Sequence, residues 1–385
     1  MRSSARTAAV IVFVFATACF AGLPSVFSGA TRLSPEPSPT SMDPAAGKIG
    51  VIPGNSYELK QLAPGVYAAV RHVEAGTVDG NTMFIINDSD VVVVDTGAYP
   101  TSARQMIAEI RKLTDKPVRY VINTHWHGDH VMGNQAYREA FPGVEIVSHP
   151  ATRGQFILNL PLEKLVPAYR AEIANIQKKL DSGKDSDGKP LTAARRKHIE
   201  LAKSDFEFWI KDANAIPLPT MTLADSLVLH RGDRTIEVKC LGKGHTDGDL
   251  VVYLPKERIV ATGDLVVHPI PFGGSQYLRE WPATLRALKR LNAATIVPGH
   301  GEIQSGWTYV DRQIALFEST WEQVKKAVDA GADLEATRKA VNGDALSKAF
   351  GATSPEARDE FDYTYLDSAI ESAFKALRPD SATNQ

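Results

Sequence analysis

The feature that most constrains this chain is a run of four potential metal ligands within six residues, His125-x-His127-x-Asp129-His130. Residues 118–123 before it alternate apolar and polar side chains, which predicts a buried strand. Residues 132–141 after it predict a helix, so the ligands follow the C-terminal end of a strand, where open α/β sheets form ligand sites. A divalent cation allows four such groups to share one polar pocket, because neutral imidazoles and a carboxylate are ordinary zinc ligands. The run therefore predicts a metal site.

The composition is that of a soluble globular protein with one large domain and extensions, or with two domains. The 385 residues are 43% hydrophobic and 23% charged, which is ordinary for this class. Lys and Arg number 43 against 45 Asp and Glu, and the sequence contains no basic block. A nucleic-acid partner is therefore not expected. We expect a small-molecule substrate, and the sequence does not indicate an oligomeric state.

Residues 1–30 have the pattern of a secretory signal. Two arginines precede an apolar segment, residues 8–16, which is short for a membrane span. Cleavage after Ala30 predicts an exported protein, periplasmic or secreted, with no membrane association once the signal is removed. Two alternatives stay open, which are lipid attachment at Cys19 and an uncleaved membrane anchor. Removal of the signal would leave Cys240 as the only thiol, so no disulfide is expected.

Changes in composition divide the rest of the chain. Residues 31–56 begin with a Pro/Ser-rich stretch and predict a disordered linker. Residues 57–305 carry short apolar runs separated by turn residues and predict the main domain. Residues 151–215 interrupt this pattern with two amphipathic, charge-rich stretches, which predict an inserted helical hairpin that either roofs the site or stabilises the periphery. Residues 306–385 predict a C-terminal helical extension.

The individual elements follow from the same periodicities. The expected strands are 66–71, 82–86, 91–94, 118–123, 144–148, 226–230, 235–241, 250–254, 259–262 and 295–297. The expected helices are 102–113, 132–141, 162–180, 192–212, 283–291 and segments between 307 and 377.

Three further polar residues stand just past the ends of apolar strands, as the first cluster does. His245 follows Leu-Gly-Lys-Gly, Asp264 follows Ile-Val-Ala-Thr-Gly, and His300 follows Ile-Val-Pro-Gly. The glycines beside them allow tight turns that bring side chains from separate strands together. With the first cluster they supply seven ligands, which is enough for two metal ions.

These motifs, in this order, resemble the metallo-β-lactamase-fold hydrolase superfamily. The resemblance rests on the His-rich run, on Gly244-His245-Thr246, Gly263-Asp264 and Gly299-His300-Gly301, and on Val94-Asp95-Thr96-Gly97 as the first motif. It covers about residues 57–305 without the helical insertion. The resemblance implies an α+β fold, a four-layer αββα sandwich with the metals at one edge of the two sheets.

The resemblance also implies roles for the ligands. His125, His127 and His245 would hold the first of two Zn²⁺ ions. Asp129, His130 and His300 would hold the second, and Asp264 would bridge the two. Asp95 would orient the His-rich loop through hydrogen bonds, as the partners of metal ligands usually do.

The expected chemistry is hydrolysis. Two cations lower the pKa of a bound water, so that a hydroxide is available at neutral pH. Asp129 would act as the catalytic residue, since it can both ligate a metal and accept the water's proton. Secreted zinc β-lactamases usually carry Cys or Ser where Asp264 stands, so the chain is more similar to glyoxalase II-like branches. We expect an ester, thioester, lactone or amide substrate, with β-lactams as an alternative.

Other functions stay open at this point. A sulfur dioxygenase of the same fold would bind one Fe²⁺ through residues matching His125, His245 and Asp264. A binding protein without catalysis is a third class, although it would be expected to have lost ligands. Candidate substrate-binding residues are those that cluster in sequence near the ligands, which are Trp126, His268, Pro271, Phe272 and Tyr277.

Overall fold

A computed structural model of the chain describes residues 49–52, 55–73, 79–185, 188, 190–212 and 215–378. The first of its two sheets has eight strands that lie side by side in chain order. They are β1 (Ile49–Ile52), β2 (Asn55–Ala63), β3 (Val66–Val73), β4 (Thr82–Ile86), β5 (Val91–Val94), β6 (Val118–Ile122), β7 (Glu145–Ser148) and β8 (Met221–Thr222). The pairs from β1 to β5 are antiparallel, and β5 to β8 are parallel.

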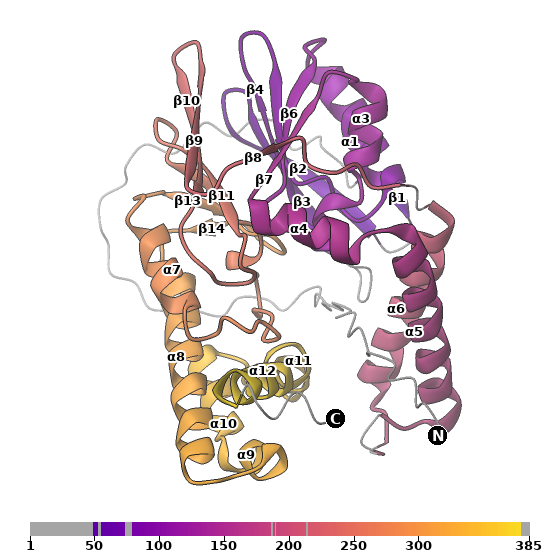
Figure 1. The fold of residues 1–385 in the computed structure, drawn as a ribbon, viewed down its shortest axis with the longest axis vertical. Helices are drawn as coiled ribbons and strands as arrows, with labels where there is room; N and C mark the ends of the chain where they lie inside the picture. Colours follow the sequence, from indigo (N-terminus) through magenta and orange to yellow (C-terminus); the bar gives the residue numbers. More distant parts are fainter. Residues whose placement is uncertain are drawn as a thin grey trace, which may run out of the picture.

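The second sheet has six strands in the spatial order β14-β13-β12-β11-β10-β9. They are β9 (Ser226–Arg231), β10 (Arg234–Cys240), β11 (Leu250–Leu254), β12 (Ile259–Ala261), β13 (Thr295–Val297) and β14 (Gln304–Ser305). All pairs are antiparallel except β12 with β13. The two sheets pack face to face in Figure 1.

Alternation along β5 shows how the layers form. Val92 and Val94 point into the core between the two sheets, whereas Val91 and Val93 point to the outer face of the first sheet. Both faces of the strand are therefore buried, which explains a continuous run of β-branched residues rather than an alternating one.

Helices cover the outer faces of both sheets (Figure 1). The first sheet is covered by α1 (Pro100–Leu113) and α3 (Asn134–Ala140), and the second by α7 (Trp281–Lys289) and α8 (Thr308–Asp329). The order helix, sheet, sheet, helix confirms the predicted four-layer αββα sandwich.

The inserted helices lie where the sequence predicts them. After α4 (Pro150–Asn159), the hairpin consists of α5 (Leu162–Ser182) and α6 (Ala193–Asp212), which pack against each other along a small apolar core of their own. Gly183, with a φ of 67°, caps the end of α5.

The C-terminal extension continues from α8 as a helical layer. Its further elements are α9 (Leu334–Ala340), α10 (Gly343–Phe350), α11 (Pro355–Phe361), the π-helical turn η2 (Asp362–Leu366) and α12 (Asp367–Leu377). They share one continuous core with α7, α8 and the outer face of the second sheet. The extension is therefore packed on the main domain.

The start of the domain differs from the prediction. The expected linker, residues 31–56, ends earlier, because β1 and the first residues of β2 pair as an antiparallel edge of the first sheet. The short edge strands β8 and β14 were not predicted either. The expected signal, Cys19 and residues 31–48 lie outside the described residues. Within the described part of the chain, no helix is both long and apolar enough to cross a membrane.

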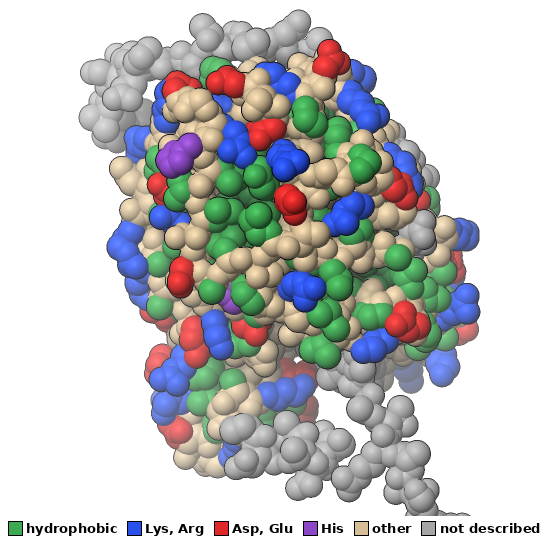
Figure 2. Space-filling model, turned by 45° about the horizontal axis from the view of Figure 1, so that its top comes forward, with side chains coloured by type: hydrophobic (Ala, Val, Ile, Leu, Met, Phe, Trp, Pro, Cys, Tyr) green, Lys and Arg blue, Asp and Glu red, His purple; other side chains and the backbone are tan. Residues whose placement is uncertain are grey.

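The surface mixes charges of both signs. Basic and acidic side chains are interspersed on the face in Figure 2, and hydrophobic side chains gather near its middle. Large hydrophobic side chains that are exposed include Leu218, Met221 and Val228, which lie in or near the edge strands β8 and β9.

Candidate metal centre

All seven predicted ligands lie at one end of the sandwich, in the turns that follow its strands. His125, His127, Asp129 and His130 follow β6, the last two on the single-turn helix α2 (Gly128–Val131). The other three are His245 between β10 and β11, Asp264 on the 3-10 turn η1 (Gly263–Leu265) after β12, and His300 after β13. Both sheets therefore contribute to one cluster.

The first group contains His125, His127, His245 and Asp264, with ligand atoms that all lie within 4.8 Å of one another. His245 Nε2 is 2.8 Å from His127 Nδ1. The Oδ2 atom of Asp264 is 3.4 Å from His245 Nε2 and 3.9 Å from His125 Nε2. Three imidazoles and one carboxylate oxygen thus converge.

The second group contains Asp129, His130, His300 and again Asp264, within the same 4.8 Å limit. His300 Nε2 is 3.0 Å from Asp129 Oδ2 and 3.1 Å from His130 Nε2. The Oδ1 atom of Asp264 is 3.2 Å from His130 Nε2. The two oxygens of Asp264 therefore face different groups, which is the arrangement of a carboxylate that bridges two ions.

The electrostatics of the two groups differ. Burial, followed by the neighbouring imidazoles, holds the pKa of His125 and of His127 well below the usual value, and burial lowers the pKa of His245 to about 4. These three rings are neutral at pH 7, as metal ligation requires. In the second group burial opposes ionisation, yet Asp264 and Asp129 raise the pKa of His300 to about 9.

The carboxylates of the site are ionised. Burial works against the charge, but His130 holds the pKa of Asp129 well below its usual range, and His300 and His130 do the same for Asp264. Two buried carboxylates among five imidazoles form a donor set that suits divalent cations.

One buried nitrogen tests whether the residues fit a metal. His125 is 1% exposed, and its Nδ1 lies 3.0 Å from Thr124 Oγ1. Its Nε2 has no hydrogen-bond partner among the described residues, although a buried polar atom left unpaired costs about 1–3 kcal/mol. This atom points into the first group, so the residues present fit a bound ion.

Asp95 bonds to the His-rich loop, in the role that the family resemblance implies. Its Oδ1 accepts a hydrogen bond from the Thr124 backbone N–H at 2.8 Å, and its Oδ2 accepts one from Thr124 Oγ1 at 2.7 Å. The same Oδ2 lies 2.9 Å from His130 Nδ1. This contact orients the ring of His130, so that Nε2 faces the second group.

Two residues that support the ligand turns were not predicted. The Asn81 amide donates hydrogen bonds of 2.9 Å to the carbonyls of Pro298 and Gly301, on either side of His300. Asp249 accepts from the Thr246 backbone N–H and hydroxyl, at 2.9 and 2.6 Å, and so closes the turn after His245. Asp249 could have been predicted, because it belongs to the Gly-His-Thr-Asp-Gly-Asp run that contains the ligand His245. Asn81 could not, because the Asp-Gly before it belongs to no recognisable motif.

The candidate substrate-binding residues divide into two sets. The Trp126 ring lies 4.5 Å from the His127 ring, and the Phe272 ring lies 6.1 Å from the His245 ring. Both therefore border the first metal group. For Tyr277, the contact shown is with Lys243, whose Nζ lies 4.8 Å from the ring centre. The His268 ring instead packs edge-on against Tyr309 of α8, at 5.1 Å.

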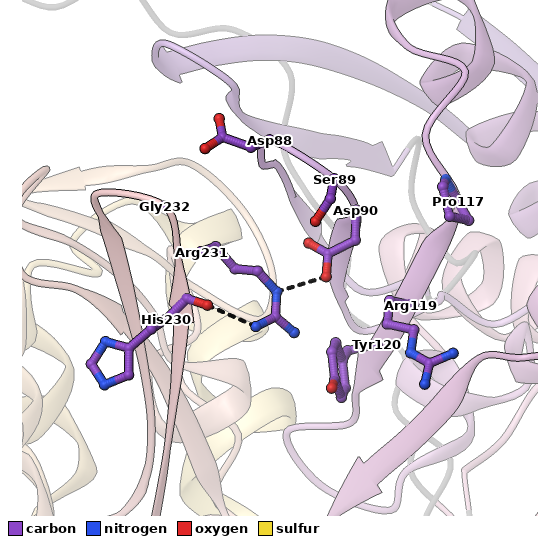
Figure 3. Close-up of a pocket in the computed structure, with 9 residues that line it drawn as sticks. All are labelled: Asp88, Ser89, Asp90, Pro117, Arg119, Tyr120, His230, Arg231 and Gly232. Atoms are coloured by element: carbon purple, nitrogen blue, oxygen red, sulfur yellow. Dashed lines mark hydrogen bonds and ion pairs between the residues drawn. The ribbon is translucent and has the colours of Figure 1, made fainter.

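A cavity of about 400 Å³ lies at the other end of the sandwich, lined by Asp88, Ser89, Asp90, Pro117, Arg119, Tyr120, His230, Arg231 and Gly232 (Figure 3). Several of these residues belong to turns at the starts of β5 and β6, whereas Asp95 and His125 follow their ends. In Figure 3 the Arg231 guanidinium points to Asp90, with which it forms an ion pair of 2.6 Å. The cavity is separate from the ligand cluster.

Comparison with known proteins places this fold and site in a family. Residues 75–156 and 162–300 match the sequence profile of the Metallo-beta-lactamase superfamily. The chain therefore belongs to this superfamily. At that level the predictions of family, fold and a metal-dependent hydrolase are confirmed.

Individual relatives are distant. The chain is 25% identical over 247 residues to a linear primary-alkylsulfatase from Pseudomonas sp., covering 59% of this chain but only 42% of that protein. It is 24% identical over 257 residues to a type 2 metallo-beta-lactamase from Bacteroides fragilis, covering 64% and 80%. The structure of a sec-alkylsulfatase from Pseudomonas sp. matches with a TM-score of 0.58 and 15% identity, over 86% of this chain and 52% of that one. The last match shows the fold alone.

Proposed function

We propose that this member of the superfamily is a dinuclear zinc hydrolase. The observation that carries the proposal is Asp264, whose two carboxylate oxygens face two separate groups of imidazoles. Bound zinc would supply Lewis acidity and an activated water at neutral pH. His125, His127 and His245 would hold one ion, and Asp129, His130 and His300 the other.

Asp129 is the candidate catalytic residue among these ligands. Burial opposes its ionisation, but chiefly His130 holds its pKa well below the usual range, so the carboxylate is ionised and able to ligate a cation. Its Oδ2 lies 3.0 Å from His300 Nε2 and 3.3 Å from His130 Nε2, which fixes its direction at the edge of the second group. A water that lies between the two groups would be within reach of this oxygen.

The substrate that we propose contains an ester-type bond, in an ester, thioester, lactone or sulfate ester, or an amide. The sulfate ester enters because relatives named alkylsulfatases match the chain in sequence and in fold. Trp126 and Phe272 border the site with apolar surface, which favours a substrate with an apolar substituent. A β-lactam is the second candidate, supported by the type 2 lactamase relatives. The carboxylate of Asp264 favours the ester-type and amide substrates over a β-lactam.

Export to the periplasm or medium is also part of this proposal. Its support is the pattern of residues 1–30, with basic residues before a short apolar segment. Comparing the mass of the mature protein from whole cells with that of the full sequence tests this step, because removal of 30 residues gives a discrete shift.

The first test is the metal content of the purified protein, measured by elemental analysis without added metal. About two zinc ions per chain, with hydrolysis of members of an ester, sulfate ester, lactone and β-lactam panel, supports the proposal. One iron per chain with oxygen uptake on a persulfide substrate would instead select the dioxygenase. A zinc-loaded protein inert on the whole panel would favour a binding protein.

A further inference from the structure

The inserted hairpin reaches the metal centre from the side of His127. Trp126 lies beside His127 and packs in one apolar cluster with Leu162 and Tyr169 of α5. Tyr169 in turn lies 4.5 Å from the ring of Trp209 on α6, which belongs to the same cluster. α5 is therefore part of the wall of the site.

The C-terminal extension reaches the same centre from the side of His245. Phe272 borders His245, and the next residue, Gly273, donates its backbone N–H to the Thr364 carbonyl in η2 at 3.2 Å. A Cβ atom at Gly273 would lie 2.0 Å from the Tyr365 carbonyl oxygen, so only glycine allows this approach. The extension thereby sets the position of the Phe272 loop.

These two additions, the hairpin and the C-terminal extension, also contact each other. Tyr363 of η2 packs against the apolar core of the hairpin. The Arg195 guanidinium of α6 lies 4.2 Å from the Tyr363 ring centre and 3.7 Å from Asp359 of α11. The His198 ring lies edge-on to Tyr363, at 4.7 Å. We call α5, α6, α11 and η2 together the arch.

We propose that the arch selects substrates for the metal centre by size, and that Arg195 and Tyr363 are the residues that keep it closed. This inference rests on the proposed hydrolase function. The closing contact involves few side chains, and those of Arg195 and Asp359 are 26% and 38% exposed. The exposed ion pair contributes little free energy, so the rings of Tyr363 and its neighbours supply most of the closing contact. Both Arg195 and Tyr363 lie outside the core between the two sheets, so single substitutions there are expected to open the arch while the sandwich stays folded.

The test compares Arg195→Ala and Tyr363→Ala with Arg231→Ala as a matched control. Arg231 also stacks on a tyrosine, Tyr120 at 5.2 Å, and pairs with an aspartate, but at the opposite end of the molecule (Figure 3). Hydrogen exchange of residues 193–212 and 355–366 reports the opening without substrate. Two chromogenic esters that share a leaving group, one acetyl and one with a bulky polycyclic acyl group, report the selection.

We expect faster exchange in both arch segments of the two arch variants. We also expect the ratio of kcat/KM for the bulky ester to that for acetyl to rise about tenfold, mainly through KM, with no change in Arg231→Ala. Faster exchange with an unchanged ratio would overturn the proposal, as would unchanged exchange in both arch variants. A uniform fall in kcat for both esters would indicate a merely structural role and overturn it too.

Failure of the proposed hydrolase function can be distinguished from failure of the arch, because the natural sequence would then hydrolyse neither ester. The arch is tested in that case by the rate at which a small and a bulky chelator remove metal from the zinc-loaded protein. Arch variants should lose metal to the bulky chelator about tenfold faster than the natural sequence and the Arg231→Ala control. Equal rates in all four proteins would reject the arch.

Discussion

The two ends of the sandwich both contain carboxylates next to basic side chains, but the charges are compensated in different ways. At one end, Asp90 and Arg231 form a closed ion pair beside Tyr120, and each charge has its partner within the chain. At the other end, Asp264 and Asp129 are buried among five imidazoles in two groups. Buried charges need compensation, and the second arrangement achieves it best with bound cations. The difference identifies the functional end more clearly than cavity volume, since the cavity in Figure 3 lies at the paired end.

The largest effect is expected from Asp264→Asn, which removes the charge shared by both groups. Losing an outer partner of a metal ligand already costs about 10- to 100-fold, so loss of the bridging ligand should lower kcat/KM by more than about 1,000-fold. Elemental analysis should show fewer than two zinc ions per chain. Asp90→Asn makes the same change at the paired end and should keep both ions. Full zinc content and activity in Asp264→Asn would contradict the bridging role.

His198 extends the comparison to a buried titratable group away from both ends. It is 4% exposed, and burial, followed by the charge of Arg195, lowers its pKa to about 4. Between pH 6.5 and 4 the unfolded chain binds a proton here that the folded chain does not, so this residue makes stability fall as pH falls. The full loss is about 3 kcal/mol, the free-energy equivalent of lowering the pKa from 6.5 to about 4.

His198→Phe keeps a ring against Tyr363 and removes this proton. Urea unfolding of both proteins at several pH values should show the variant gaining stability relative to the natural sequence as pH falls from 6.5 to 4. The neighbouring charges of Arg195, Asp359 and Asp362 are common to both proteins, as are the metal ligands, so their titration cancels in the difference. A pH-independent difference would show that His198 binds its proton equally well in the folded and unfolded chain, so that its pKa is not lowered by folding.

A smaller effect at the metal end is expected from Asp95→Asn. The backbone of Asp95 has a positive φ of 59°, which Asn also tolerates, so the fold of the turn should be kept. The amide loses an acceptor for Thr124 Oγ1 and His130 Nδ1. Zinc affinity should fall about 10- to 100-fold, as measured by competition with a chromogenic chelator. An affinity equal to that of the natural sequence would mean that Asp95 only shapes the backbone.

Local sequence sufficed to predict the ligand cluster. The ligands all lie in turns that follow strand ends, and strand ends meet at one edge of a sheet, so residues as distant as His125 and His300 could be predicted to converge. The bridging role of Asp264 between the two metal groups was implied by the resemblance to the family. The inserted helices α5 and α6 were predicted from long amphipathic, charge-rich stretches, although α5 contains Pro167.

Contacts between elements could not be predicted in the same way. Asn81 donates hydrogen bonds to backbone carbonyls more than 200 residues away. Every residue has a backbone carbonyl, so the sequence does not indicate which ones Asn81 contacts. Tyr363 lies in a helical stretch like many others, and its contact with Arg195 depends on how two additions pack. The sequence places residues 49–52 in the linker, because four residues are too few to show a clear strand periodicity. In the structure they pair with β2 as an antiparallel edge strand.

The smallest effect is expected at the paired end. Arg231→Ala removes an ion pair whose arginine is 20% exposed and leaves Asp90 with a hydrogen bond from the Asn87 amide, at 3.0 Å. Unfolding free energy should fall by no more than about 1 kcal/mol, the upper end for partly exposed pairs. The double variant with Asp90→Asn should lose little more, because the partner charge is then gone as well. Zinc content and kcat/KM should stay unchanged in both, and a change in either would mean that the two ends are coupled through β5 and β6.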